Sequence, residues 1–308
     1  MRSPLAILLA LLPLASLPLG SVAMASQPKE THPVQPARFP RSSREGIVSA
    51  IARLSTLPGG WERTRAASEA FLGARYRRAP LGDGGSSGPR LRWDAVDCLT
   101  FVETSLAVGE ARSLDEVEPI LDDIRYEGGK APSFESRLHL MEAQWIPDLI
   151  RKGYVEEATR RLGGDRVIEA SVTYTAESWA KREDLKGQPW SPRLAGTHSI
   201  PVIPLDAAIE LGPSLPEGLV LNVVRVPAAG KVSLITHTGL VVVKDGKRFV
   251  RHAALAEREV IDEPIERFLR RHAGMRSRRV LGVNLLAVRP NAERARRAAE
   301  SRLLDTSR

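Results

Sequence analysis

The 308-residue sequence contains only one cysteine, Cys98. A single cysteine excludes an internal disulfide framework and any zinc or iron–sulfur site that needs several thiolates. The sequence also lacks the G-x-x-x-x-G-K-[ST] pattern of P-loops and the H-E-x-x-H pattern of zincins. No repeat of solenoid length is present. The lone thiol and the six histidines therefore become the first side chains to consider for chemistry.

The N-terminus carries the features of a secretory signal peptide. An apolar run over residues 5–12 follows Arg2, and small residues form a cleavage site that ends at Ala25. We therefore expect residues 1–25 to be removed. An uncleaved membrane anchor is the alternative, which two prolines near the run disfavour. No other run is long enough to span a bilayer, so the sequence predicts an exported, periplasmic protein without a stable membrane span.

The net charge is +8 at pH 7, from 45 Lys and Arg against 37 Asp and Glu. A basic protein favours anionic partners, among them nucleic acid, phospholipid and anionic cell-wall polymer. Export argues against nucleic acid as the partner. With 43% hydrophobic and 27% charged residues the chain can bury a core, so wholesale disorder is excluded.

The chain divides into a leader, a linker, one domain and a tail. Residues 26–44, rich in proline and charge, are expected to be a flexible linker. Residues 45–290 are expected to form one α+β domain, because helical periodicity comes first and β-branched runs follow. Residues 291–308 form a basic tail to which we assign no function. We expect helices at about 45–57, 61–72, 98–109, 115–125, 137–152, 155–162 and 264–272, and strands at 167–174, 219–226, 234–243, 248–254 and 279–288.

Cys98 follows Asp97, a residue type that commonly caps helix N-termini. The cysteine is therefore expected in the first turn of a helix, where unpaired backbone N–H groups favour the thiolate and lower the thiol pKa. A free thiol in an exported protein is a liability unless it is buried or used. Two interpretations remain open on position alone: a catalytic nucleophile, or a buried structural cysteine.

Two histidines, His237 and His252, flank a predicted hairpin. Asp245 and Gly246 lie between β-branched runs, which is a strong signal for a two-residue turn. With these residues at the turn centre, His252 lies opposite Gly239, and His237 lies on the same face one diagonal step away. The register thus predicts two neighbouring imidazoles on one face of the sheet, which suits a base and a group that orients it.

The order of these residues resembles the NlpC-type cell-wall hydrolases of the papain-like fold. Those enzymes carry Asp-Cys at a helix start, His-x-Gly on a strand and a third polar residue, often in a His-Ala pair, on the next strand. The corresponding segments here are Asp97-Cys98, His237-Thr238-Gly239 and His252-Ala253.

A closer resemblance is to one branch, the N-acetylmuramoyl-L-alanine amidase-like family long filed as a domain of unknown function. It covers about residues 71–290. That branch combines a D-C-x-T-F-V-E signature with an R-Y-x-x-G segment, an R-x-H segment followed by tryptophan, and an I-P loop. The matching residues are Asp97-Cys98-Leu99-Thr100-Phe101-Val102-Glu103, Arg125-Tyr126-Glu127-Gly128-Gly129, Arg137-Leu138-His139 with Trp145, and Ile200-Pro201. The chain departs from the branch at Leu140, where an aromatic residue is expected, and at Gly218-Leu219, where Gly-Asp is expected.

The resemblance implies an α+β, papain-like fold and hydrolysis of an amide in peptidoglycan or muropeptides, with no metal or cofactor. It implies that Cys98 is the nucleophile and that His237 takes the thiol proton and then delivers it to the leaving amine. It implies that His252 orients the His237 ring.

The resemblance also implies a substrate cleft. The candidate binding residues are Arg125, Tyr126, Arg137 and His139, with structural ion pairs as the alternative interpretation. Together with Arg90 and Arg92 the arginines suit carboxylates and would repel the free amine that a γ-D-glutamyl-diamino acid endopeptidase must hold. We therefore favour cleavage between N-acetylmuramate and L-alanine, with the endopeptidase as second choice.

Two other classes of function remain open. A non-catalytic wall-binding module would keep the fold and the basic surface, but it has no need of a reactive thiol. A metal-binding exported protein could use His237 and His252, although no further ligand is evident nearby in the sequence.

Overall fold

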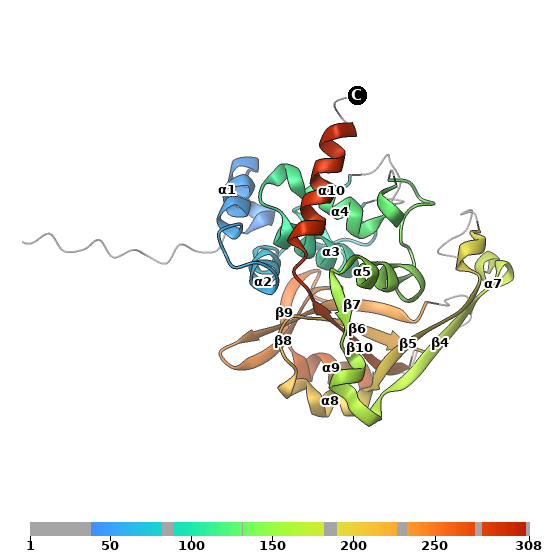
Figure 1. Cartoon of the computed structure of the whole chain (residues 1–308). Coiled ribbons are helices and arrows are strands. Elements are labelled where there is room, and N and C mark those ends of the chain that lie inside the picture. The colour runs from blue at the N-terminus through green and yellow to red at the C-terminus, as the bar shows by residue number, and fades with distance from the viewer. Residues whose placement is uncertain are drawn as a thin grey trace, which may run out of the picture. The chain divides into compact units, whose positions relative to one another are not determined.

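The computed structural model describes residues 38–81, 89–130, 132–181, 190–226, 233–274 and 279–305. The expected signal peptide and most of the expected linker lie outside these ranges. The described chain is a mixed helix-and-sheet structure with a curled sheet, so the α+β expectation is confirmed (Figure 1).

Helices fill much of the first half of the described chain, and most long strands lie in the second. The helices are α1 (Arg44–Leu54), α2 (Trp61–Ala70), α3 (Cys98–Glu110), α4 (Leu114–Arg125), α5 (Ile146–Lys152), α6 (Thr159–Gly163), α7 (Ala176–Ala180), α8 (Leu205–Leu211), α9 (Ile265–Ala273) and α10 (Ala292–Asp305). Shorter turns of helix are η1 (Phe39–Arg41), η2 (Glu127–Gly129), η3 (Met141–Trp145), η4 (Gly164–Arg166), η6 (Pro192–Leu194) and η7 (Gly212–Ser214). Of the helices described, none is long and apolar enough to cross a membrane.

The described strands form one sheet. They are β1 (Arg75–Tyr76), β2 (Ala95–Val96), β3 (Val155–Glu157), β4 (Ile168–Tyr174), β5 (Gly196–Pro204), β6 (Leu219–Arg225), β7 (Ile235–Lys244), β8 (Lys247–Ala254), β9 (Glu259–Pro264) and β10 (Val280–Val288). Their order is β2-β1-β9-β8-β7-β6-β10-β5-β4, and β3 also pairs with β10.

The two faces of this sheet pack against different helices (Figure 1). One face carries Leu240 and Val242 of β7 and belongs to the larger core, which includes α2, α3 and α4. The other face carries Val241 and packs against Ile265 and Phe268 of α9. Alternate residues of β7 enter different cores because successive side chains of a strand point to opposite faces.

The β7–β8 hairpin has the predicted register. Asp245 and Gly246 both have positive φ, 49° and 73°, as the favoured two-residue hairpin turn requires. The strands then pair as this turn dictates, as far as Leu240 opposite Arg251.

Two expected helices are confirmed only in their later residues. Residues 137–140 do not begin a helix, because the Leu138 N–H donates to the Arg125 carbonyl at 2.9 Å and holds this segment beside the end of α4. The expected helix at 155–162 is divided, because its first residues pair with β10 as β3 and only the rest forms α6. In both places hydrogen bonds to distant parts of the chain override local helical periodicity.

Both ends of the described chain pack onto the helical half. Phe39 is buried, and its ring centroid lies 5.0 Å from that of Phe71. The expectation of a flexible linker is therefore wrong for residues 38–44. At the other end, an ion pair of 2.7 Å between Arg294 and Asp123 ties α10 to α4, so the basic tail is largely a docked helix.

Candidate active site

Cys98 is the first residue of α3, as predicted. The Asp97 carboxylate accepts a hydrogen bond from the Thr100 N–H at 2.9 Å, and the Asp97 N–H donates to the Thr100 hydroxyl at 2.9 Å, which completes a capping box. On the strand side, the backbone N–H of Thr238 faces the sulfur. The β7–β8 ladder ends at Leu240, two residues away, whereas Thr238 pairs with Asn222 of β6. The thiol therefore lies at the open end of the hairpin.

The expectation of a low thiol pKa is wrong. Burial raises the pKa of Cys98 to about 12, and the neighbouring Asp97 acts in the same direction. Backbone N–H groups, among them that of Thr238, favour the thiolate but are outweighed. Helix position alone predicts the opposite direction because it ignores how far the sulfur is removed from water. The neutral thiol is therefore favoured at rest, and Cys98 would need a base in order to act as a nucleophile.

His237 and His252 lie side by side on one face of the sheet. A hydrogen bond of 2.8 Å joins His237 Nε2 to His252 Nδ1, and the two rings are nearly perpendicular. A Cβ at Gly239 would lie 2.9 Å from the His252 Cβ, so the absence of a side chain there permits this arrangement. Both rings contact Phe268 of α9, with centroid distances of 5.9 and 5.1 Å. The imidazoles thus lie on the face of the sheet that packs against α9.

Burial keeps both imidazoles neutral at pH 7. It lowers the pKa of His252 to about 3 and holds that of His237 well below its ordinary value. The positive charges of Arg271, Arg225 and a protonated His272 would lower the pKa of His237 further. A neutral imidazole has one nitrogen with a lone pair, which is the state a general base needs.

Cys98 and His237 are neighbours through the backbone of β7, because Thr238 directly follows His237. Within the described part of the chain the thiol makes no hydrogen bond to the His237 ring, and Nδ1 of that ring has no hydrogen-bond partner. The structure thus joins the two predicted histidines directly and places the thiol beside the strand that carries the first of them.

Glu263 on β9 is a site residue that the sequence analysis missed. Its Oε2 lies 3.3 Å from His252 Nε2, and its side chain is 4% exposed. Arg271 and Arg267 of α9 lie 3.0 and 3.5 Å from the same carboxylate. Burial raises the pKa of Glu263, and the two arginines oppose that change. The sequence over 259–264 has no sustained β-branched run, so no strand was expected there to bring a carboxylate beside the histidine.

Arg125, Tyr126 and Arg137 gather around the buried Glu103 instead of lining an open cleft together. Arg125 Nε donates to Glu103 Oε2 at 2.6 Å, and an Arg137 nitrogen lies 3.5 Å from the same oxygen. The Arg137 guanidinium also lies 5.9 Å from the centre of the Tyr126 ring. Arg125 and Tyr126 are 2% and 3% exposed, so neither is placed to contact a substrate. The predicted binding role of Arg125 and Tyr126 is therefore contradicted by their burial, and Arg125 instead forms a buried ion pair with Glu103.

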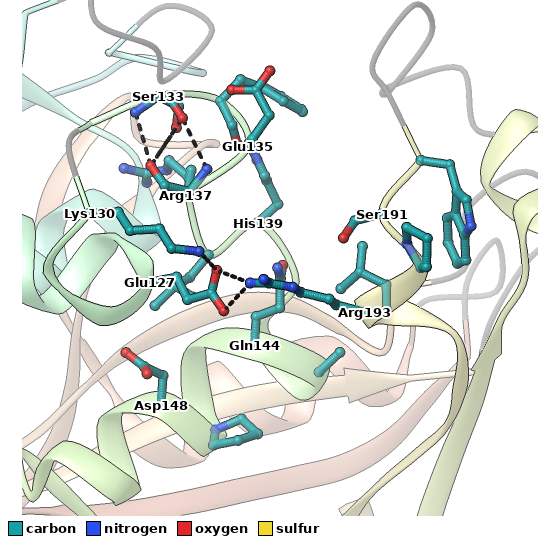
Figure 2. Close-up of a pocket in the computed structure, with 18 of the residues that line it drawn as sticks. Glu127, Lys130, Ser133, Glu135, Arg137, His139, Gln144, Asp148, Ser191 and Arg193 are labelled. Carbon is teal, nitrogen blue, oxygen red and sulfur yellow. Dashed lines mark hydrogen bonds and ion pairs between the residues drawn. The ribbon is translucent and has the colours of Figure 1, made fainter.

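Arg137 and His139, by contrast, line a pocket of about 790 Å³ (Figure 2). Its walls come from two parts of the chain, within residues 127–151 and 179–194. Arg193 lies 2.9 Å from Glu127 across the pocket. The lining residues include Lys130, Ser133, Phe134, Gln144, Asp148, Arg151, Trp179 and Trp190.

Arg137 connects this pocket with the region of the thiol. Arg137 and Asp97, the residue before Cys98, influence each other's pKa, which places the guanidinium near the start of α3. Arg137 Nη1 is buried and, among the described residues, has no hydrogen-bond partner. His139 is less available, because its Nε2 lies 2.7 Å from the Phe134 carbonyl oxygen.

The other arginines of the expected cleft are already paired. Arg90 forms an ion pair with Asp122, and Arg92 lies 2.8 Å from Asp94. The expectation that these side chains offer free positive charge to a substrate is therefore wrong. In the described ranges, no group of three or more His, Cys, Asp and Glu residues is suited to hold a metal ion.

Known proteins resemble this chain over most of its length. A family model described as AmiA-like, N-acetylmuramoyl-L-alanine amidase-like, matches residues 66–275. One similar solved structure is a protein from Legionella pneumophila str. Philadelphia 1 of the DUF1460 family model, with 22% identity and a TM-score of 0.68 over 80% of this chain and 95% of that chain. Another is an N-acetylmuramoyl-L-alanine amidase from Bacteroides uniformis, with 20% identity and a TM-score of 0.57 over 73% of this chain and 97% of that chain. No curated protein matches the chain. At these identities the similarity to the solved structures supports a conclusion about the fold alone.

Proposed function

The chain belongs to the N-acetylmuramoyl-L-alanine amidase-like (AmiA-like) family, and on that premise we propose that it hydrolyses an amide bond in peptidoglycan or its fragments. The proposed bond joins the lactyl group of N-acetylmuramate to L-alanine. This preference now follows the family, because the arginines that argued against a free amine are paired with carboxylates. We further propose an NlpC-type, papain-like site in an exported, periplasmic enzyme.

The observation that carries the proposal is the 2.8 Å hydrogen bond between His237 and His252 on the strand pair whose residue Thr238 lies next to Cys98. In the proposed reaction, His237 Nδ1 accepts the thiol proton while the Cys98 sulfur attacks the lactyl carbonyl carbon. A C–S bond forms, and the C–N bond breaks as His237 delivers the proton to the leaving nitrogen. Water then hydrolyses the thioester. The products are a muramic acid carboxylate and a peptide that begins with L-alanine.

Both partners start uncharged in this scheme. Burial raises the pKa of Cys98 and lowers that of His237, so a resting thiolate–imidazolium pair is disfavoured. Proton transfer therefore accompanies attack on the substrate instead of preceding it. The backbone N–H of Cys98, at the start of α3, is a natural donor to the oxyanion that forms.

Arg137 is the proposed substrate contact of the pocket. Two guanidinium groups share the single Glu103 carboxylate, with Arg137 at the longer distance of 3.5 Å. Arg137 Nη1 has no partner among the described residues and belongs to a pocket-lining side chain. A carboxylate of the stem peptide would accept a hydrogen bond from this donor. His139 lines the same pocket and is proposed as a weaker contact.

Digestion of a defined muropeptide, followed by mass spectrometry, tests the proposal. The expected product is an intact stem peptide that begins with L-alanine, released by the wild type and absent with Cys98→Ser. A fragment in which L-alanyl-D-glutamate stays on muramate would make the enzyme an endopeptidase and leave the cysteine mechanism in place. Binding of wall fragments without any product would make the chain a non-catalytic binding module.

A further inference from the structure

We propose that Glu263 is a positioning residue that fixes the tautomer of His237 through His252. The geometry concerns only these three side chains, and its consequence for turnover rests on the proposed function. His237 Nε2 lies 2.8 Å from His252 Nδ1, and His252 Nε2 lies 3.3 Å from Glu263 Oε2. The three groups form one chain of hydrogen bonds that runs from β7 through β8 to β9.

The protons on the two imidazoles can be assigned by starting from the Glu263 carboxylate. An ionised carboxylate only accepts hydrogen bonds, so His252 Nε2 must carry a proton and donate it to Glu263. A neutral imidazole has one N–H, so His252 Nδ1 is then an acceptor. His237 Nε2 must therefore be the donor of the 2.8 Å hydrogen bond. The remaining nitrogen, His237 Nδ1, keeps its lone pair and is the base.

Two neighbouring arginines favour the ionised form of Glu263 that this assignment requires. Arg271 lies 3.0 Å and Arg267 3.5 Å from its oxygens. Burial is the largest influence and raises the pKa of Glu263; Glu257 acts in the same direction, and the two arginines oppose both. Burial, together with Arg271 and a protonated His272, disfavours a charge on the rings, which keeps each ring at one proton. Negative charge at the carboxylate and neutral imidazoles are thus favoured together.

Reversing the donors and acceptors in this series of hydrogen bonds shows what the carboxylate contributes. If a donor replaced it, His252 Nε2 would become the acceptor and His252 Nδ1 would carry the proton. His237 Nε2 would then be the acceptor, and the His237 proton would move to Nδ1. The number of hydrogen bonds would be unchanged, but the nitrogen proposed to receive the thiol proton would be blocked. Glu263 therefore selects between two arrangements of the protons that have the same number of hydrogen bonds.

Nuclear magnetic resonance of protein labelled with ¹⁵N-histidine tests this assignment directly. In the wild type at neutral pH, we expect His237 to carry its proton on Nε2 and His252 to carry its proton on Nε2. In Glu263→Gln the side-chain amide can donate to His252, so we expect a measurable population with the His237 proton on Nδ1. The matched control is Glu259→Gln, an exposed residue of the same strand, in which both tautomers should stay as in the wild type.

Turnover provides the second readout. Glu263→Gln should lower kcat by roughly 10–100-fold, the range seen for other outer partners of functional imidazoles, with little change in KM because Glu263 does not face the pocket. Glu259→Gln should leave both constants unchanged. A purely structural role would alter thermal stability without moving the tautomer populations.

The results separate this inference from the proposed function. The proposed role of Glu263 is overturned if wild-type His237 carries its proton on Nδ1. It is also overturned if a folded Glu263→Gln variant shows unchanged tautomers. The wild-type spectrum decides the question even if the variant fails to fold. Wild-type protein with the expected tautomers but no hydrolysis of wall substrates would overturn the proposed function. The proposed role of Glu263 in fixing the tautomers would still hold.

Discussion

Two regions of the molecule bury polar side chains in different ways. Around Glu103, two arginines and a carboxylate meet as full charges, at 2.6 and 3.5 Å. Around His252, neutral rings are joined through hydrogen bonds to a carboxylate whose charge is balanced from α9. Loss of a partner in the first region leaves a buried charge uncompensated, which is costly. In the second region protons can change position without a net change of charge, so we expect structural effects from the first and catalytic effects from the second.

Replacement of the thiol should have the largest effect on activity. Cys98→Ser removes the proposed nucleophile, and we expect kcat to fall by roughly 10⁴-fold or more, measured by release of stem peptide from muropeptide. The melting temperature should stay close to that of the wild type, because the serine hydroxyl replaces the thiol with little change of shape. Retained turnover would remove Cys98 from the mechanism.

The two histidines should differ in importance. His237→Ala removes the proposed base, and we expect a loss of about 10³–10⁴-fold in kcat. His252→Gln keeps a group that can hydrogen-bond the His237 ring, so its loss should be nearer 10–100-fold. Steady-state kinetics on the same muropeptide compare the two variants. Equal losses would contradict separate roles for the two rings.

The arginine region should respond through stability. Arg125→Met leaves the Glu103 carboxylate buried beside a single, more distant arginine, and we expect a loss of about 3–5 kcal/mol in the free energy of unfolding. Arg193→Ala breaks an exposed ion pair with Glu127 and should cost less than about 1 kcal/mol. Urea denaturation measures both. Similar losses for the two variants would remove the distinction between buried and exposed charge.

Acid should weaken the histidine region. The pKa of His252 is about 3 in the folded chain, against an ordinary value of 6.5, so below pH 6.5 the unfolded chain binds more protons. Stability is therefore fully present above pH 6.5 and is lost as pH falls toward 3. His252 alone should contribute a loss of about 2 kcal/mol between pH 7 and pH 5. Thermal melts at a series of pH values should show a smaller loss over this interval for His252→Gln.

The smallest expected effect is on thiol labelling. Because burial raises the pKa of Cys98 to about 12, its reaction with iodoacetamide at pH 8 should be at least about tenfold slower than that of a free cysteine. The rate should continue to rise above pH 9, where a free thiol approaches its maximum. A fast reaction that is independent of pH from 7 to 9 would indicate a resting thiolate.

The features that the sequence predicts well depend on neighbours in the chain. The turn at Asp245 and Gly246 sets the register of β7 and β8 by itself, so the pairing of His237 with His252 follows from local chemistry. The N-cap at Asp97 is equally local and places Cys98 at a helix start.

The features that the sequence does not reveal depend on distant segments. Glu263 reaches His252 only because β9 pairs with β8, and Arg125 is turned inward only because Glu103 of α3 lies beside it. The pKa of Cys98 depends on burial by the packed fold, which helix position cannot report. The residue type of Arg125 suggests substrate binding, but its 2.6 Å contact with the Glu103 carboxylate indicates a structural role.

The place of β10 in the sheet has a consequence for how the chain folds. This strand comes last in the sequence, yet it lies between β6 and β5, and the helix that follows it pairs Arg294 with Asp123, 171 positions earlier. Such long-range closure slows folding, because the entropy of ordering the intervening chain is lost before the contacts form. Until residues near 280–288 have left the ribosome, β5 and β6 lack their shared neighbour and expose unpaired edges. The sheet can therefore close only when synthesis is nearly complete, and truncation before β10 should yield chains that aggregate.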